Sequence, residues 1–124
     1  MKQVWIVDDD EEMIRAVQMM LKLLDCEASF FLNARQAARE FLAGRRPDLL
    51  ILDIQMPEVT GIDLLEFLRR RSEWKELPVI MLSSEAADLQ VDQALALGAD
   101  AYLTKPVSLQ ELEVAIQKAF MGTQ

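Results

Sequence analysis

The feature that most constrains this chain is the regular alternation of short apolar runs with longer amphipathic segments. Continuous apolar residues of strand length occupy residues 4–7, 49–52 and 79–82, and weaker strand candidates lie at 27–31 and 101–103. Unbroken apolar runs of this length are typical of strands buried on both faces of a parallel sheet. The segments between them carry apolar residues at helical spacing. Read in order, the chain predicts five strand–helix pairs.

Local signals for the starts and ends of helices agree with this reading. Ser108 and Glu111 have the spacing of a capping box, and Gly44 and Gly98 stand where helices should end. Alternating strands and helices with short connections predict a parallel sheet covered on both faces. We therefore expect one α/β domain over residues 1–124, built on a single doubly wound five-stranded parallel sheet with five helices.

Charge and residue usage exclude several classes of function. The chain has 13 basic and 21 acidic residues, a net charge of −8, no histidine and one cysteine. The absence of histidine excludes serine triads, Cys–His pairs and ordinary zinc sites. The acidic balance argues against direct binding of nucleic acid. With neither an apolar run of membrane-spanning length nor the apolar core of a signal peptide, a cytoplasmic protein without membrane contact is the expectation.

Two short basic clusters are expected to be solvated helix ends. They are Arg45-Arg46 and Arg69-Arg70-Arg71.

Polar residues follow four of the five expected strands. Asp8 and Asp9 come after the first, Asp53 after the third, Ser83 after the fourth and Lys105 after the fifth. Sites in sheets of this type lie at the carboxyl ends of the strands, so these side chains should meet at one edge. The combination of acids, a hydroxyl group and one lysine predicts a site that handles a phosphoryl group.

The carboxylates at this edge predict a site for a hard cation. Several carboxylates held close together repel one another, and oxygen ligands without nitrogen or sulfur favour Mg²⁺, with Mn²⁺ as the alternative. Asp9 and Asp53 are the expected direct ligands, joined by the backbone carbonyl of Gln55. Asp8 is expected to hold a metal-bound water.

The same residues predict a covalent phosphoryl acceptor. A lysine supplies a fixed positive charge for a phosphoryl oxygen and a hydroxyl group adds one hydrogen bond, so Lys105 and Ser83 would serve Asp53 as the nucleophile. Residues 8–12 contain no glycine. This loop would repel the phosphate of a nucleotide or flavin unless a metal ion intervened, and no cofactor-binding site is expected.

Together, these residues resemble the receiver domain of bacterial two-component response regulators, over essentially the whole chain. The motifs are Val7-Asp8-Asp9, the segment 53–57 followed by Gly61, then Ser83, and finally Lys105-Pro106. Each motif alone is weak, but four in the right order on the right strand ends are specific.

The resemblance implies a flavodoxin-like fold and His-Asp phosphorelay signalling. Asp53 would accept a phosphoryl group from a sensor histidine kinase, a phosphotransfer protein or a small acyl phosphate, with Mg²⁺ held by Asp8, Asp9 and Asp53. Lys105 would pair with the phosphoryl group through a segment with a cis bond to Pro106. Ser83 would hydrogen-bond the phosphoryl oxygen and Tyr102 would be the switch aromatic. Such a domain catalyses only its own phosphorylation and dephosphorylation.

The chain departs from the family pattern at a few positions. Thr60 stands before Gly61 where the family usually has aspartate, and is expected to cap the following helix instead. Ser83 stands where threonine is more frequent and keeps the hydroxyl group. Gln55 and Glu85 occupy positions that influence the dephosphorylation rate, so the phosphoryl lifetime stays open.

The fourth helix suggests where partners bind. Its expected core-facing stripe consists of Ala87, Val91, Ala94 and Leu95, which places Leu89 on the opposite face. In receiver domains the fourth helix, fifth strand and fifth helix carry partner contacts. We expect Leu89 and Tyr102 near a surface for a downstream effector or a homodimer.

Two other functions would use part of the same residue set. A phosphohydrolase that forms an aspartyl phosphate needs a second acid two residues after the nucleophile, and that position is Gln55. A receiver-like interaction domain that works without phosphorylation is the remaining alternative, although such domains usually lack an acid or the lysine.

Overall fold

The computed structural model describes residues 1–84 and 88–121, apart from the side chains of Asp88 and Leu89. The strands are β1 (Lys2–Val7), β2 (Cys26–Phe31), β3 (Leu49–Asp53), β4 (Val79–Ser83) and β5 (Ala101–Thr104). The helices are α1 (Glu11–Leu23), α2 (Ala34–Leu42), α3 (Gly61–Arg69), α4 (Asp88–Ala96) and α5 (Leu109–Met121). The predicted order of five strand–helix pairs is confirmed, including the two weaker strands.

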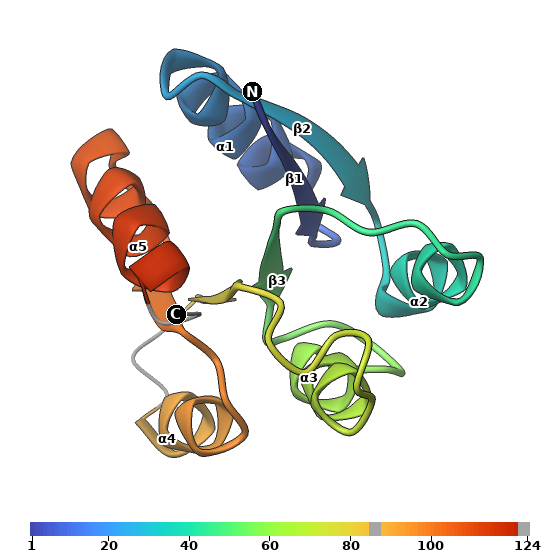
Figure 1. Cartoon of the computed structure of the whole chain (residues 1–124). Coiled ribbons are helices and arrows are strands. Elements are labelled where there is room, and N and C mark those ends of the chain that lie inside the picture. The colour runs from blue at the N-terminus through green and yellow to red at the C-terminus, as the bar shows by residue number, and fades with distance from the viewer. Residues whose placement is uncertain (85–87, 122–124) are drawn as a thin grey trace.

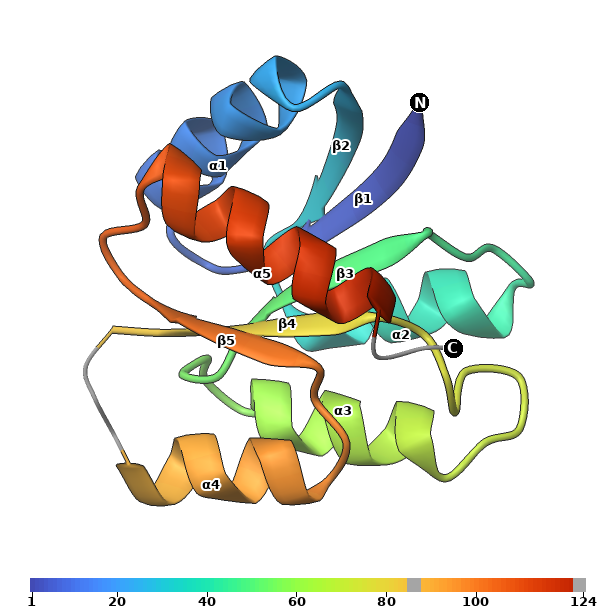
Figure 2. The ribbon, with the colours of Figure 1, turned by 60° about the vertical axis from the view of Figure 1, so that its left-hand side comes forward.

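The five strands form one parallel sheet in the order β2-β1-β3-β4-β5. Helices α1 and α5 cover one face of the sheet, while α2, α3 and α4 cover the other (Figures 1 and 2). The predicted doubly wound α/β fold is therefore confirmed. None of the helices in the described part of the chain combines the length and the apolar character needed to cross a bilayer.

Each face of the sheet has its own core, because successive strand residues point in opposite directions. Val4 and Ile6 of β1 pack with residues of α1 and α5, whereas Trp5 and Val7 pack with residues of α2 and α3. Strands β3 and β4 are buried along their whole length, as their unbroken apolar sequences predict.

The helix boundaries follow the predicted capping signals. The Thr60 hydroxyl accepts a hydrogen bond from the Asp63 N–H while the Asp63 carboxylate accepts one from the Thr60 N–H, which confirms Thr60 as a cap. Ser108 and Glu111 form the same reciprocal pair at the start of α5. Gly44 and Gly98, with φ of 91° and 103°, end α2 and α4 in the left-handed region that favours glycine.

The predicted core stripe of α4 is partly wrong. Val91 and Ala94 are buried as expected, but the Leu95 side chain is 41% exposed. Leu97, just beyond the helix, is the leucine that packs against the core instead. Leu95 follows Ala94 by about 100° around the helix axis, which turns it away from the sheet. Ala87 and the side chain of Leu89 lie outside what the structure describes.

The prediction that all three arginines of residues 69–71 are solvated is also wrong. The Arg69 side chain is only 11% exposed and forms an ion pair with Asp100, with 3.4 Å between Nη2 and Oδ2. Its guanidinium also donates hydrogen bonds to the carbonyls of Trp74, Leu77 and Gly98. Arg69 therefore joins the end of α3 to the segment before β4 and to the turn before β5.

Candidate functional site

Three carboxylates meet at the edge of the sheet where the strands end. Val7 of β1 pairs with Leu52 of β3, so the residues that follow them, Asp8 and Asp53, stand side by side. One carboxylate oxygen from each of Asp8, Asp9 and Asp53 lies within 4.8 Å of the others. Asp8 and Asp53 are buried, whereas Asp9 is exposed. The parallel topology thus produces the predicted acidic cluster.

Lys105 reaches this cluster from the loop after β5, across the end of β4. Its Nζ lies 3.0 Å from Asp8 Oδ2 and 3.5 Å from Asp53 Oδ1, and its side chain is only 14% exposed. Burial alone would lower the pKa of Lys105, but its hydrogen bond to Asp8 and the charges of Asp53 and Asp8 raise it. Lys105 is therefore a fixed positive charge. The expected cis bond between Lys105 and Pro106 is present.

The pKa of Asp53 is raised from 3.8 to about 7. The main cause is burial, and the neighbouring Asp8 carboxylate adds to it, while Lys105 and the Gln55 N–H act in the opposite direction. One lysine therefore does not offset two buried carboxylates, and the cluster favours a further positive charge.

The donor set of the cluster fits a hard divalent cation. All three side chains offer oxygen atoms, and the buried Oδ2 atom of Asp8 has Lys105 Nζ 3.0 Å away as its ion-pair partner. The exposed carboxylate of Asp9 leaves the cluster open to solvent. A Mg²⁺ ion would add the positive charge that reduces the repulsion between Asp8 and Asp53. The Gln55 carbonyl remains a predicted ligand.

Hydrogen bonds from backbone N–H groups hold the two buried carboxylates in place. The Asp10 N–H donates to Asp8 Oδ1 at 3.0 Å, and the Gln55 N–H donates to Asp53 Oδ1 at 3.3 Å. The loop after β3 is tied to α3 by a bond of 3.1 Å from the Gly61 N–H to the Ile54 carbonyl. Backbone N–H groups therefore position both carboxylates together with Lys105.

Ser83 lies on β4, which pairs with β3, and Tyr102 lies on the edge strand β5, which pairs with β4. Ser83 is fully buried as the last residue of β4, directly beyond Leu82, which pairs with Asp53. Tyr102 is 48% exposed on β5, where it lines an apolar groove with Val114 of α5. Ser83 is thus at the predicted edge and the Tyr102 ring faces outward; their switch roles remain predictions. Glu85 lies outside the described residues.

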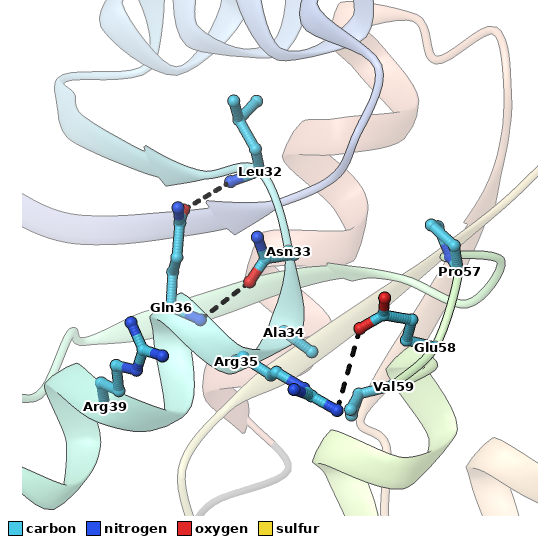
Figure 3. Close-up of a pocket in the computed structure, with 9 residues that line it drawn as sticks. All are labelled: Leu32, Asn33, Ala34, Arg35, Gln36, Arg39, Pro57, Glu58 and Val59. Atoms are coloured by element: carbon cyan, nitrogen blue, oxygen red, sulfur yellow. Dashed lines mark hydrogen bonds and ion pairs between the residues drawn. The ribbon is translucent and has the colours of Figure 1, made fainter.

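A pocket that the sequence did not indicate lies between the start of α2 and the loop after β3 (Figure 3). Its volume is about 340 Å³, and its lining includes Arg35, Arg39 and Glu58. Arg35 and Glu58 lie across it at 3.8 Å, with side chains 65% and 73% exposed. An ion pair this exposed contributes little to stability. Arg35 and Glu58 are far apart in the sequence, and no sequence motif indicates that they meet.

The raised pKa of Asp53 leads to a prediction about stability without divalent ions. Between about pH 4 and pH 7 the folded protein keeps a proton on Asp53 that the unfolded chain releases, so the free energy of unfolding falls as pH rises. Asp53→Asn removes this effect. We expect the variant to exceed the wild type in stability by up to about 4 kcal/mol above pH 7, and the difference to vanish near pH 4.

Urea unfolding in EDTA at several pH values between 4 and 8 measures this difference. Asp92→Asn, which changes an exposed carboxylate of α4, is the control and should show no such trend. Added Mg²⁺ should stabilise the wild type more than Asp53→Asn, because it binds the folded state. A stability difference that does not change with pH would contradict the assignment of the raised pKa to Asp53.

Comparisons with known proteins agree with this geometry. A family model described as the response regulator receiver domain matches residues 4–117. The phosphate regulon transcriptional regulatory protein PhoB of Rhizobium meliloti is 36% identical over 115 residues, which cover 93% of this chain and 50% of that protein. The chemotaxis protein CheY of Pseudomonas aeruginosa is 34% identical over 118 residues, 95% of each chain.

The fold is also similar to that of solved structures. The chemotaxis protein CheY4 of Vibrio cholerae superposes with a TM-score of 0.85 at 28% identity, over 96% of this chain and 98% of that one. Among the curated relatives, the chain spans about half the length of the PhoB proteins of Rhizobium meliloti and Pseudomonas aeruginosa, and 17% of protein RcaC of Microchaete diplosiphon. The similarity to those longer proteins therefore concerns only their matching segment.

Proposed function

Because the chain belongs to the response regulator receiver domain family, we propose that it is a phosphorelay signalling module whose phosphoacceptor is Asp53. The observation that carries this proposal is the position of Lys105 Nζ, 3.0 Å from Asp8 and 3.5 Å from Asp53, at the edge where three carboxylates meet. Residues 1–124 would form one receiver domain. A sensor histidine kinase, a phosphotransfer protein or a small acyl phosphate would supply the phosphoryl group.

The site residues have complementary tasks in this transfer. A carboxylate oxygen of Asp53 attacks phosphorus, and the bond between phosphorus and the donor's leaving group breaks. Lys105 pairs with a phosphoryl oxygen and Ser83 donates a hydrogen bond to another. Mg²⁺, held by Asp8, Asp9, Asp53 and the Gln55 carbonyl, would neutralise the charge that gathers on the phosphoryl oxygens. In dephosphorylation, a water oxygen attacks phosphorus, the bond between phosphorus and the Asp53 oxygen breaks, and inorganic phosphate leaves the restored carboxylate.

Phosphorylation would change the charge and the contacts at the ends of β3 and β4. The phosphoryl group brings a charge of about −1.5 to −2 and new acceptor oxygens. Ser83 would move toward it, and the Tyr102 ring would turn inward into the space that Ser83 leaves. A partner that contacts α4, β5 and α5, with Leu89 and Tyr102 at its edge, would detect the difference. A downstream effector or a second copy of the chain is the expected partner.

A constitutive interaction domain is the alternative. It would need neither a buried phosphoacceptor nor a lysine within ion-pair distance of it. Asp53 and Lys105 are both present, buried or nearly so, and in contact. These contacts favour the phosphorylated module over the alternative.

Incubation with acetyl phosphate and Mg²⁺, followed by intact-mass measurement, tests the proposal. We expect one phosphoryl adduct in the wild type and in the control variant Asp92→Asn, and none in Asp53→Asn. EDTA should abolish the adduct, because Mg²⁺ offsets the charge of three carboxylates and the incoming phosphate. An adduct that persists in Asp53→Asn would disprove the assignment, and no adduct with any donor would favour the constitutive interaction domain.

A further inference from the structure

The side chain of Gln55, which belongs to the loop after β3, is hydrogen-bonded both to the segment that follows β4 and to helix α4. Its Nε2 atom donates a hydrogen bond to Gln90 Oε1 at 3.4 Å, and its Oε1 atom accepts one from the Ser84 hydroxyl. Both ends of one amide are thus engaged by groups from different elements. We call this set of three side chains, Gln55, Ser84 and Gln90, the amide bridge.

Two members of the amide bridge, Gln55 and Ser84, adjoin residues of the candidate phosphorylation site. The backbone N–H of Gln55 donates to Asp53 Oδ1 at 3.3 Å. Ser84 directly follows Ser83, the buried hydroxyl residue at the end of β4. A displacement of Ser83 toward Asp53 must therefore move Ser84 and disturb its hydrogen bond to the Gln55 amide.

We propose that Gln90, through the amide bridge, is a positioning residue that favours the unphosphorylated arrangement and so sets how readily Asp53 holds a phosphoryl group. This inference rests on the proposed function, in which Ser83 moves toward the phosphoryl group. An interaction made in only one of two conformations shifts the equilibrium toward that conformation. Removing the Gln90 end of the bridge should therefore make the phosphorylated arrangement easier to reach.

The expected effect is modest, because the bridge is partly exposed to solvent. One hydrogen bond of this kind shifts an equilibrium by about two- to fivefold. We therefore expect Gln90→Ala to bind beryllofluoride, a tetrahedral analogue of a phosphoryl group, about two- to fivefold more tightly at a fixed Mg²⁺ concentration. The half-saturating concentration can be followed by fluorine NMR of the bound anion.

Two comparisons separate this role from a general effect on α4. Gln93→Ala changes an exposed glutamine of the same helix that has no part in the bridge, and it should bind like the wild type. In a double-mutant cycle, Gln90→Ala should have no further effect in a Gln55→Ala background, because the amide it contacts is gone. A change in helix stability alone would persist in that background.

The outcomes distinguish this inference from the function on which it rests. Tighter binding by Gln90→Ala that disappears in the Gln55→Ala background supports the role of Gln90. Unchanged or weaker binding by Gln90→Ala, with normal binding by the wild type, overturns the role and leaves the proposed function intact. Failure of the wild type to bind beryllofluoride with Mg²⁺ overturns both.

Discussion

Replacing Arg69 with methionine is expected to lower the free energy of unfolding by about 3–5 kcal/mol, a large part of the stability of an ordinary domain. Methionine keeps much of the apolar stem but removes every donor. Asp100, whose side chain is 14% exposed, then loses its ion-pair partner. The carbonyls of Trp74, Leu77 and Gly98 lose the donors that now reach them at 2.7–3.2 Å.

Arg70→Met is a matched control at the next position. Arg70 pairs with Glu66 at 3.4 Å on the surface, with side chains 75% and 45% exposed, so its loss should change stability by about 0.5 kcal/mol or less. Urea unfolding followed by circular dichroism measures both variants. Equal effects of the two substitutions would show that the Arg69 network contributes no more than a surface pair.

Acidic solution should reduce the defect of Arg69→Met. Burial raises the pKa of Asp100, while the Val79 N–H and Arg69 lower it, so loss of Arg69 raises it further. Protonation then removes the unpaired buried charge. If Asp100 is the source of the loss, Arg69→Met/Asp100→Asn should recover part of the stability at neutral pH. A double variant less stable than Arg69→Met at every pH would place the loss in the carbonyl contacts alone.

The sequence was sufficient to predict the edge on which the site lies. Asp8, Asp53 and Lys105 are far apart in the chain, but each comes at the end of a segment that the sequence predicts to be a parallel strand, although the signal before Lys105 is weaker. Parallel strands end on one edge, so recognising the strands brings the three side chains together. In the structure Lys105 Nζ lies 3.0 Å from Asp8 and 3.5 Å from Asp53, as this shared edge leads one to expect.

Contacts made between side chains and distant backbone were not predictable in this way. Most of Arg69's acceptors are carbonyl groups, which every residue carries, so nothing in the sequence marks them as partners of an arginine. Gln55 and Gln90 are 35 positions apart, in segments whose relative placement depends on the path of the loops. The burial of Leu95 was predicted wrongly because it depends on how α4 is rotated about its axis, and hydrophobic spacing defines that rotation only to within about one residue.

The close packing of Gly61, at the start of α3, against the Asp53 backbone affects the geometry of the candidate site. A Cβ atom added to Gly61 would lie 2.0 Å from the carbonyl oxygen of Asp53 and 2.8 Å from its carbonyl carbon. Both are backbone atoms, so rotation of a side chain cannot relieve the clash. The start of α3 and the end of β3 would have to separate by about 1 Å to restore ordinary contact. That movement acts directly on the residue proposed as phosphoacceptor.

Gly61→Ala is therefore expected to reduce both stability and phosphorylation. Helix propensity alone would make alanine the better residue by about 1 kcal/mol, but overpacking against backbone should reverse the sign and lower stability by about 1–3 kcal/mol. Since a misplacement of about 1 Å in a reacting group can reduce a rate about 100-fold, we expect a decrease of that order in the rate of Mg²⁺-dependent phosphorylation by acetyl phosphate.

Gly44→Ala is the control that separates the effect on stability from the effect on the phosphorylation rate. A Cβ at Gly44 meets nothing within 4 Å, but φ is 91°, so alanine is strained there and stability should fall without any change near Asp53. Phosphorylation of Gly44→Ala should proceed at the wild-type rate under conditions where both variants are folded. If Gly61→Ala also kept the wild-type rate, the contact between α3 and the Asp53 carbonyl would not position the phosphoacceptor. A slow rate confined to Gly61→Ala would show that it does.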